Sequence, residues 1–335
     1  MQYLPLGRTG LHVSRIGFGG IPIQRISPEE TTRLMDAVLA AGINFIDTAR
    51  GYTVSEAQLG YALRGRRDRV ILATKSMART REAMAHDIDQ SLANLQTDTI
   101  DLYQIHNPSP EQFDTVFSSG GAIEALTAAK TAGKIRHIGL TAHSLTVLER
   151  ALEREEVETV MFPYNLVETQ GEELIHRAAE KGIGFIAMKP LAGGAIEDAT
   201  LAIHFLVSNP DVTVVIPGMY HPDEVVQNVA AAESTTPLSA EEQQRASAIV
   251  QQLGHHFCRR CNYCAPCTVG IQIPNVFLFE GYLSRYGLED WARSRYATLS
   301  VKASACIGCG KCEARCPYHL PIREMLKKCS RAFGE

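Results

Sequence analysis

Short apolar runs rich in valine and isoleucine alternate with longer amphipathic segments between residues 15 and 232. Apolar runs of this length, bounded by turn residues, are typical of buried β-strands. The pattern predicts strands at residues 15–19, 44–48, 69–75, 100–106, 134–141, 159–165, 184–190 and 212–218. Before them, residues 3–14 predict a short hairpin around a glycine-containing turn.

The amphipathic segments predict helices between these strands. In residues 27–42, Ser27 is a suitable N-cap, Pro28 takes the first helical position and Glu30 completes a capping box. The same character is found at residues 80–95, 171–182 and 221–232. A further helix is predicted after the last strand, at residues 239–254.

Eight alternating strand and helix units predict an α/β fold, the (β/α)8 TIM barrel, whose usual size is about 250 residues. The alternative is a doubly wound open sheet, which usually has fewer strands and a glycine-rich fingerprint after the first. Here the first strand leads into GFGG, without the G-x-G-x-x-G spacing. Beyond residue 254 the composition changes abruptly. We therefore expect a barrel at residues 1–254 and a small, helical C-terminal domain at residues 255–335.

Composition excludes several classes of function. The 335 residues carry a net charge of −4 and no basic stripe, which argues against a nucleic-acid partner. No run of about 18 apolar residues occurs, and the N-terminus has no apolar core of a signal peptide. We expect a cytoplasmic protein with no membrane partner. Clustered cysteines in that compartment indicate metal or redox chemistry rather than disulfides.

Ionisable residues stand at the ends of three consecutive predicted strands. Asp47, Lys75 and His106 end the second, third and fourth strands, and Tyr52 follows in the loop after Asp47. In a (β/α)8 barrel the carboxyl ends of the strands meet at one mouth, where the chemistry takes place. We therefore expect these four side chains to converge.

These residues also carry a family resemblance. The stretches NFIDTARGYTVSEAQLG, ATK and LYQIH, with the opening LGRTGLHVSRIGFGG and the late VIPG, resemble the aldo-keto reductase family over residues 1 to 232. The resemblance implies a catalytic tetrad of Asp47, Tyr52, Lys75 and His106. It also implies reversible reduction of a small carbonyl substrate, or oxidation of an alcohol, with NAD(H) or NADP(H).

The chemistry of the tetrad is consistent with that reaction. Hydride attack on a carbonyl develops an alkoxide that needs a proton. The pKa of a free tyrosine is about 10, which is poorly matched to neutral pH. The ammonium of Lys75 would stabilise the phenolate of Tyr52, and Asp47 would keep Lys75 charged. His106 would donate a hydrogen bond to the substrate oxygen. Tyr52 is therefore the expected proton donor.

The resemblance further implies a set of nucleotide contacts, in which Thr141 and His143 take the places of a serine and asparagine pair. Glycines of the LAGGA loop would let backbone N–H groups approach a pyrophosphate. The expected cofactor-binding residues are Thr141, His143, Asn165, Lys189, Gly193, Gly194, Gly218, Glu224 and Asn228.

The adenine end differs from NADPH-dependent members of the family. Gly218 and Glu224 stand where those members have basic residues. An acidic side chain would repel a 2′-phosphate and accept a hydrogen bond from a free 2′-hydroxyl. This difference favours NADH.

All nine cysteines lie in the C-terminal part, from Cys258 onward. Residues 306–317 have the spacing C-x2-C-x2-C-x3-C-P of bacterial ferredoxins, and residues 258–267 have C-x2-C-x2-C-x2-C, with Thr268 in place of the proline. In ferredoxins with two clusters, the fourth cysteine of each run binds the other cluster. The spacing thus predicts two [4Fe–4S] clusters. The expected ligand sets are Cys258, Cys261, Cys264 and Cys316, and Cys306, Cys309, Cys312 and Cys267.

Zinc is the alternative, although four-cysteine zinc sites usually consist of two separated pairs. Cys329 belongs to neither run and is expected to be a buried side chain. Two functions remain open at this point. The first is a carbonyl reductase or alcohol dehydrogenase that carries two clusters and contacts a possible redox partner protein. The second is a nucleotide-binding redox sensor or electron carrier in which carbonyl reduction is incidental.

Overall fold

The computed structural model describes all residues from 1 to 335. Contacts along the chain divide it into two compact units. Unit 1 consists of Met1–Asn165, Thr169–Leu191 and Asp198–Leu238. Unit 2 consists of Leu166–Glu168, Ala192–Glu197 and Ser239–Glu335.

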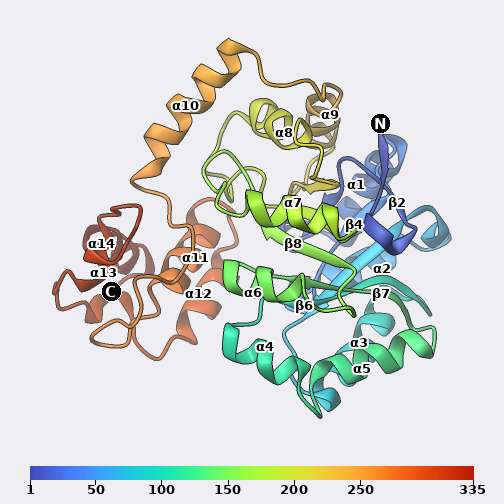
Figure 1. Ribbon diagram of the computed structural model, residues 1–335, viewed down its shortest axis with the longest axis horizontal. Helices are drawn as coiled ribbons and strands as arrows, with labels where there is room; N and C mark the ends of the chain where they lie inside the picture. Colours follow the sequence, from blue (N-terminus) through green and yellow to red (C-terminus); the bar gives the residue numbers. More distant parts are fainter. The chain divides into compact units, whose positions relative to one another are not determined.

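Unit 1 is a barrel of eight parallel strands with helices outside them (Figure 1). The strands are β3 (Phe18–Gly19), β4 (Phe45–Asp47), β5 (Ile71–Ser76), β6 (Ile100–His106), β7 (Ile135–Thr141), β8 (Thr159–Pro163), β9 (Gly184–Met188) and β10 (Val214–Ile216). Each pairs with the next in chain order, and bridges from Ile16 to Val215 and from Gly19 to Gly218 close the ring. The predicted fold and its eight strands are confirmed.

The helices of unit 1 follow the strands in alternation. They are α1 (Pro28–Ala40), α2 (Ser55–Ala62), α3 (Arg81–Leu95), α4 (Pro110–Phe117), α5 (Ala122–Thr131), α6 (Leu145–Ala151), α7 (Glu172–Glu180), α8 (Ala199–Val207) and α9 (Pro222–Ala231). Short 3-10 helices are η1 (Gly7–Thr9), η2 (Pro22–Arg25) and η3 (Arg67–Arg69). The capping box predicted at Ser27 and Glu30 is present at the start of α1.

The N-terminal hairpin covers the amino-terminal end of the barrel. Its strands β1 (Tyr3–Pro5) and β2 (His12–Ser14) pair antiparallel, as predicted. Leu6 and Val13 belong to one buried apolar cluster with Phe45, Leu102 and Ile186 of the barrel strands. Those strand residues precede the polar strand ends, so apolar packing fills the amino-terminal end and leaves the carboxyl-terminal end for polar side chains.

Unit 2 has a helical framework and its own apolar core. Its helices are α10 (Ala240–Gly254), α11 (Ile273–Ser284), α12 (Glu289–Ala297), η4 (Ala303–Ala305), α13 (Lys311–Ala314) and α14 (Ile322–Phe333). Several cysteines are part of that core, with Val276, Phe277 and Leu326. Cys329 is buried there, 3% exposed. None of the helices of the chain combines the length and apolar character that a membrane crossing needs.

Candidate functional site

Three neighbouring strands bring the predicted tetrad residues to one end of the barrel. Asp47 and His106 are the last residues of β4 and β6, and Lys75 is the penultimate residue of β5, which lies between them. Tyr52 lies in the loop between β4 and α2. Its backbone N–H donates to Ala49 O at 3.0 Å and its carbonyl accepts from Ser55 N at 2.8 Å, so the loop is tightly turned.

Lys75 and Asp47 form a buried ion pair. Lys75 Nζ lies 2.5 Å from Asp47 Oδ2 and 2.8 Å from the carbonyl oxygen of Thr48, and both side chains are less than 5% exposed. Burial lowers the pKa of Lys75, while the carboxylate of Asp47 acts in the opposite direction. Burial likewise raises the pKa of Asp47, but each partner favours the charged form of the other, and the pair holds the lysine nitrogen at the carboxyl-terminal end of the barrel.

Gln104 belongs to the same group, and the sequence interpretation missed it. Its Nε2 donates to Asp47 Oδ1 at 3.1 Å, so both oxygens of Asp47 are held. Gln104 is fully buried. It lies two residues before His106 on β6, and residues two apart on a strand share a face. That alternation is the signal that could have identified it.

Tyr52 and His106 face each other above the ion pair. Their ring centroids are 6.1 Å apart and nearly perpendicular, and Lys75 Nζ lies 5.1 Å from the centroid of the tyrosine ring. Both residues are half-buried. Arg79, also missed from sequence, donates to the carbonyl oxygen of His106 at 2.8 Å and so fixes the end of β6. A phenol and an imidazole, both partly exposed, are therefore grouped with a buried ammonium at the carboxyl-terminal end of the barrel.

Thr141 and His143, at and after the end of β7, are both connected to Asn107. The N–H of Asn107 donates to the hydroxyl of Thr141 at 3.0 Å, and the N–H of His143 donates to Asn107 Oδ1 at 3.1 Å. After β8, Asn165 is fully buried and its amide donates to the carbonyl oxygen of Lys189 at 2.9 Å. These residues thus lie at or just after the carboxyl ends of four neighbouring strands, β6 to β9. They are Asn107, Thr141, His143, Asn165 and Lys189.

Glu224 accepts two backbone hydrogen bonds that the sequence did not indicate. Its Oε2 accepts from the backbone N–H groups of Tyr220, at 2.8 Å, and His221, at 3.0 Å. The carboxylate therefore satisfies two backbone N–H groups at the start of α9. Gly218, which precedes this helix, is exposed. Asn228 is buried on the same helix. Arg25, which was also missed, stacks 3.5 Å from the ring centroid of Tyr220.

The glycine loop after β9 belongs to unit 2. Ala192, Gly193 and Gly194 all have positive φ angles, between 50° and 80°. Such a conformation is costly for residues with a Cβ, so the two glycines suit this turn. Within unit 2, Arg285 Nε donates to the carbonyl oxygen of Gly193 at 2.9 Å.

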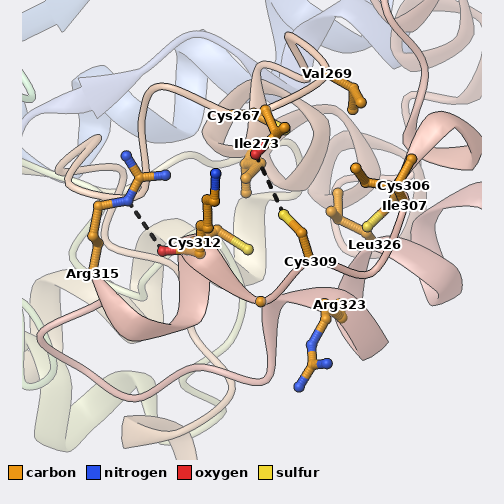
Figure 2. A pocket seen from close by; sticks show the side chains of 13 residues that line it. Cys267, Val269, Ile273, Cys306, Ile307, Cys309, Cys312, Arg315, Arg323 and Leu326 are labelled. Carbon is orange, nitrogen blue, oxygen red and sulfur yellow. Dashed lines mark hydrogen bonds between the residues drawn. The ribbon is translucent and has the colours of Figure 1, made fainter.

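Four cysteines surround one cavity in unit 2 (Figure 2). They are Cys267, Cys306, Cys309 and Cys312. The hydroxyl of Thr268 lies 3.4 Å from Cys309 Sγ, and this hydrogen bond lowers the pKa of the exposed Cys309. Nowhere in the chain do three His, Cys, Asp or Glu side chains meet closely enough to hold a single metal ion. Four cysteine side chains around one hollow are the kind of donor set that an iron–sulfur cluster takes.

The other four cysteines of the two runs also belong to unit 2. They are Cys258, Cys261, Cys264 and Cys316. Burial raises the pKa of Cys258 to about 11 and that of Cys264 to about 12. Burial also raises the pKa of Cys261, and neighbouring Cys316 acts in the same direction. Cys312 raises the pKa of Cys264 in the same way, so Cys312 and Cys316 of the second run both lie within electrostatic range of the first run.

Two arginines between Cys258 and Cys261 make buried contacts within unit 2. Arg259 Nε donates to the carbonyl oxygen of Val167 at 2.6 Å. Arg260 Nη2 donates to Glu168 Oε1 at 2.6 Å, and the side chains of this pair are 11% and 0% exposed. The sequence interpretation identified neither contact, because the partners are 92 residues apart.

Comparison with known families gives two matches. Residues 15–200 match the aldo/keto reductase family, and residues 257–321 match a 4Fe-4S dicluster domain. The first match covers more than half of the chain, and the second contains both cysteine runs.

Individual relatives agree with the first match. An aldo-keto reductase of Bacillus subtilis is 34% identical over 194 residues, which are 52% of this chain and 57% of that protein. L-galactose dehydrogenase of Arabidopsis thaliana is 27% identical over 289 residues, 71% of this chain and 90% of that protein. Among solved structures, the holo form of an aldo-keto reductase from Bacillus halodurans has a TM-score of 0.65 at 29% identity, and covers 74% of this chain and 96% of that one.

Proposed function

Because the chain belongs to the aldo/keto reductase family, we propose that it transfers hydride between a nicotinamide nucleotide and a carbonyl or alcohol substrate. The observation that carries this proposal is the buried pair of Lys75 and Asp47 beside Tyr52 and His106 at the carboxyl ends of three adjacent strands. A site of this composition can deliver a proton to an oxygen while a hydride reaches the adjacent carbon.

Each member of the tetrad has a distinct role in the proposal. The bound nucleotide supplies the hydride. Tyr52 donates its phenolic proton to the substrate oxygen, which becomes the alcohol. Lys75 stabilises the phenolate left behind, and Asp47 with Gln104 keeps the ammonium in place. His106 donates a hydrogen bond that orients the carbonyl. The unit 1 residues proposed to contact the nucleotide are Thr141, His143, Asn165, Lys189, Gly218, Glu224 and Asn228.

Steady-state turnover tests this proposal. Anaerobic protein should oxidise NADH when it is given members of a panel of aldehydes, ketones and sugars. NADH should also bind at least as tightly as NADPH. Glu224 stands where a 2′-phosphate would bind, and its negative charge would repel that phosphate. Its carboxylate also already accepts from the two backbone N–H groups there, those of Tyr220 and His221. Direct titration with each nucleotide measures this preference.

A matched variant separates the effect of the charge of Glu224 from the effect of its two hydrogen bonds. Glu224→Gln keeps an acceptor for the N–H groups of Tyr220 and His221 but removes the charge, so it should narrow the preference for NADH. A clear NADPH preference in the unchanged protein would contradict the electrostatic argument. Nucleotide binding without turnover over the whole panel would instead favour a redox sensor or electron carrier.

The C-terminal part, beyond residue 254, is proposed to hold two [4Fe–4S] clusters. One would use Cys267, Cys306, Cys309 and Cys312, and the other Cys258, Cys261, Cys264 and Cys316. Supporting this are the dicluster match and the cavity lined by the first four cysteines. Hydride transfer moves two electrons together, whereas such a cluster normally accepts one, so the clusters serve a step other than the hydride transfer itself, such as exchange with a redox partner protein.

Two four-iron clusters fix an expected metal content. Anaerobically purified protein should contain about eight iron atoms and about eight acid-labile sulfides per chain. Iron, sulfide and zinc analysis of the same sample measures this. Stoichiometric zinc with no labile sulfide would refute the clusters, and about four irons would reduce them to one.

A further inference from the structure

The carboxylate of Glu56 lies at the centre of a buried polar group that no step of the proposed reaction uses. The residue is 1% exposed and is the second residue of α2. Its Oε1 accepts from the hydroxyls of Thr74 and Ser91, each at 2.8 Å. Its Oε2 accepts from Arg50 Nη1 at 3.0 Å and from Asn94 Nδ2 at 3.1 Å. Four donors satisfy the acceptor capacity of a carboxylate, so this is a specific arrangement.

Two of these donors connect Glu56 to tetrad residues. Arg50 lies two residues before Tyr52, and its backbone N–H donates to the carbonyl oxygen of Lys75 at 3.0 Å. Thr74 directly precedes Lys75 on β5. Successive side chains on a strand point to opposite faces. Thr74 therefore binds Glu56 on one side of the strand, while Lys75 binds Asp47 on the other.

We propose that Glu56 is a positioning residue for the proton transfer: it holds the loop that carries Tyr52 and the strand that carries Lys75, and adds a second buried carboxylate behind that ammonium. This inference rests on the proposed function. The electrostatics of Lys75 support it. Burial lowers the pKa of Lys75, and the carboxylates of Asp47 and Glu56 both act to raise it.

Other titratable and charged groups lie near Glu56 and Lys75. Around Lys75 these groups are Asp47, Glu56 and Tyr52, and His106 lies beside Tyr52. Around Glu56 they are Arg50 and, through it, Asp87 of α3, 3.7 Å from Arg50 Nε. Tyr103 of β6 contacts Ser91, and burial raises the pKa of its phenol far beyond the usual range. Glu56 also raises the pKa of Arg50 and of Tyr103, but Arg50 stays charged and Tyr103 stays protonated near neutral pH. Removing the charge of Glu56 should therefore change titration in this range through Lys75, and through Lys75 that of Tyr52.

Glu56→Gln is the sharpest test, because glutamine can keep all four partners. Its oxygen can accept from Arg50 and Asn94, and its NH2 can donate to the hydroxyls of Thr74 and Ser91, which accept as well as donate. Only the charge is lost. Loss of a negative charge makes deprotonation of its neighbours easier. The basic limb of the pH profile of kcat/KM for carbonyl reduction should therefore move to lower pH.

A second readout does not depend on turnover. The ultraviolet absorbance of tyrosinate, as a difference between proteins with and without Tyr52→Phe, follows the ionisation of Tyr52 alone. In the Glu56→Gln background this ionisation should also move to lower pH. The matched control is Asp101→Asn, which neutralises a buried carboxylate held by Arg67 and Arg136 at the start of β6. That variant should leave both measurements unchanged.

Arg50→Gln tests the positioning of the loop. It removes the charged partner of Glu56 without touching the tetrad, and should lower kcat by up to about 10²-fold, the cost of a small misplacement of a reacting group. Nucleotide affinity should stay the same. Unchanged Tyr52 ionisation in Glu56→Gln, or shifts of equal size in Asp101→Asn, would overturn the inference. If the unchanged protein shows no carbonyl turnover, the proposed function fails, and the absorbance titration still decides the role of Glu56.

Discussion

Tyr52→Phe should lower kcat for carbonyl reduction by about 10²–10⁴-fold, the usual contribution of a positioned acid or base. The substitution removes only the hydroxyl that is proposed to donate the proton. His106 and Lys75 would keep their places, because His106 is fixed by its strand and by Arg79, and Lys75 by Asp47. Affinity for the nucleotide should therefore change little, and the measurement is kcat beside a direct binding titration.

The control for this variant lies nine residues away. Tyr61→Phe removes a phenolic hydroxyl from an exposed position on α2. It should leave kcat unchanged. Activity near the original level in Tyr52→Phe would reject Tyr52 as the proton donor, and an equal loss in Tyr61→Phe would show that the effect is not specific to the site.

Arg260→Met should destabilise unit 2 by about 3–5 kcal/mol, the typical cost of breaking a buried ion pair by removing one partner. The carboxylate of Glu168 is fully buried, and Arg260 donates to it at 2.6 Å. Without the guanidinium, a buried charge loses its counter-ion in a place that water does not reach. Because Arg260 lies between Cys258 and Cys261, loss of this contact should also make the clusters easier to lose.

Anaerobic urea unfolding, followed by the visible absorbance of the clusters, measures this effect as a lower midpoint. Arg293→Met is the matched control, since Arg293 pairs with Glu289 at 2.9 Å on the surface of α12 and such pairs contribute only about 0.3–0.5 kcal/mol. A combined Arg260→Met and Glu168→Gln variant removes both charges of this pair and should regain most of the stability. If Arg260→Met unfolds no earlier than Arg293→Met, the pair does not stabilise unit 2.

Local patterns predicted the barrel well because its strands and capped helices obey local rules. The run IDLYQIH is buried along nearly its whole length in β6, and the Ser27 capping box starts α1 as expected. Helix α2 shows where such rules stop. It buries Ser55, Glu56 and Gln58 together with Leu59, so it has no simple apolar stripe. Its polar residues are buried because their partners come from other elements.

The sequence predicted those residues of the candidate site whose positions depend on the ends of strands. Asp47, Lys75 and His106 lie on adjacent strands because parallel strands align their carboxyl ends. The residues that hold them are less visible. Gln104 could have been found by alternation along β6, whereas the contact between Glu56 and Ser91 joins residues 35 positions apart. No local pattern encodes a pairing of that separation.

The discontinuous make-up of unit 2 has a consequence for synthesis on the ribosome. Residues 166–168 and 192–197 are made well before the cysteines, yet their contacts group them with residues 239–335. The hydrogen bonds from Arg260 to Glu168 and from Arg285 to Gly193 can therefore form only after the C-terminal part has left the exit tunnel. A chain that stops at residue 238 would never receive these partners. Deleting the cysteine-rich part would therefore also remove contacts of these two earlier segments, and would not remove one independent module.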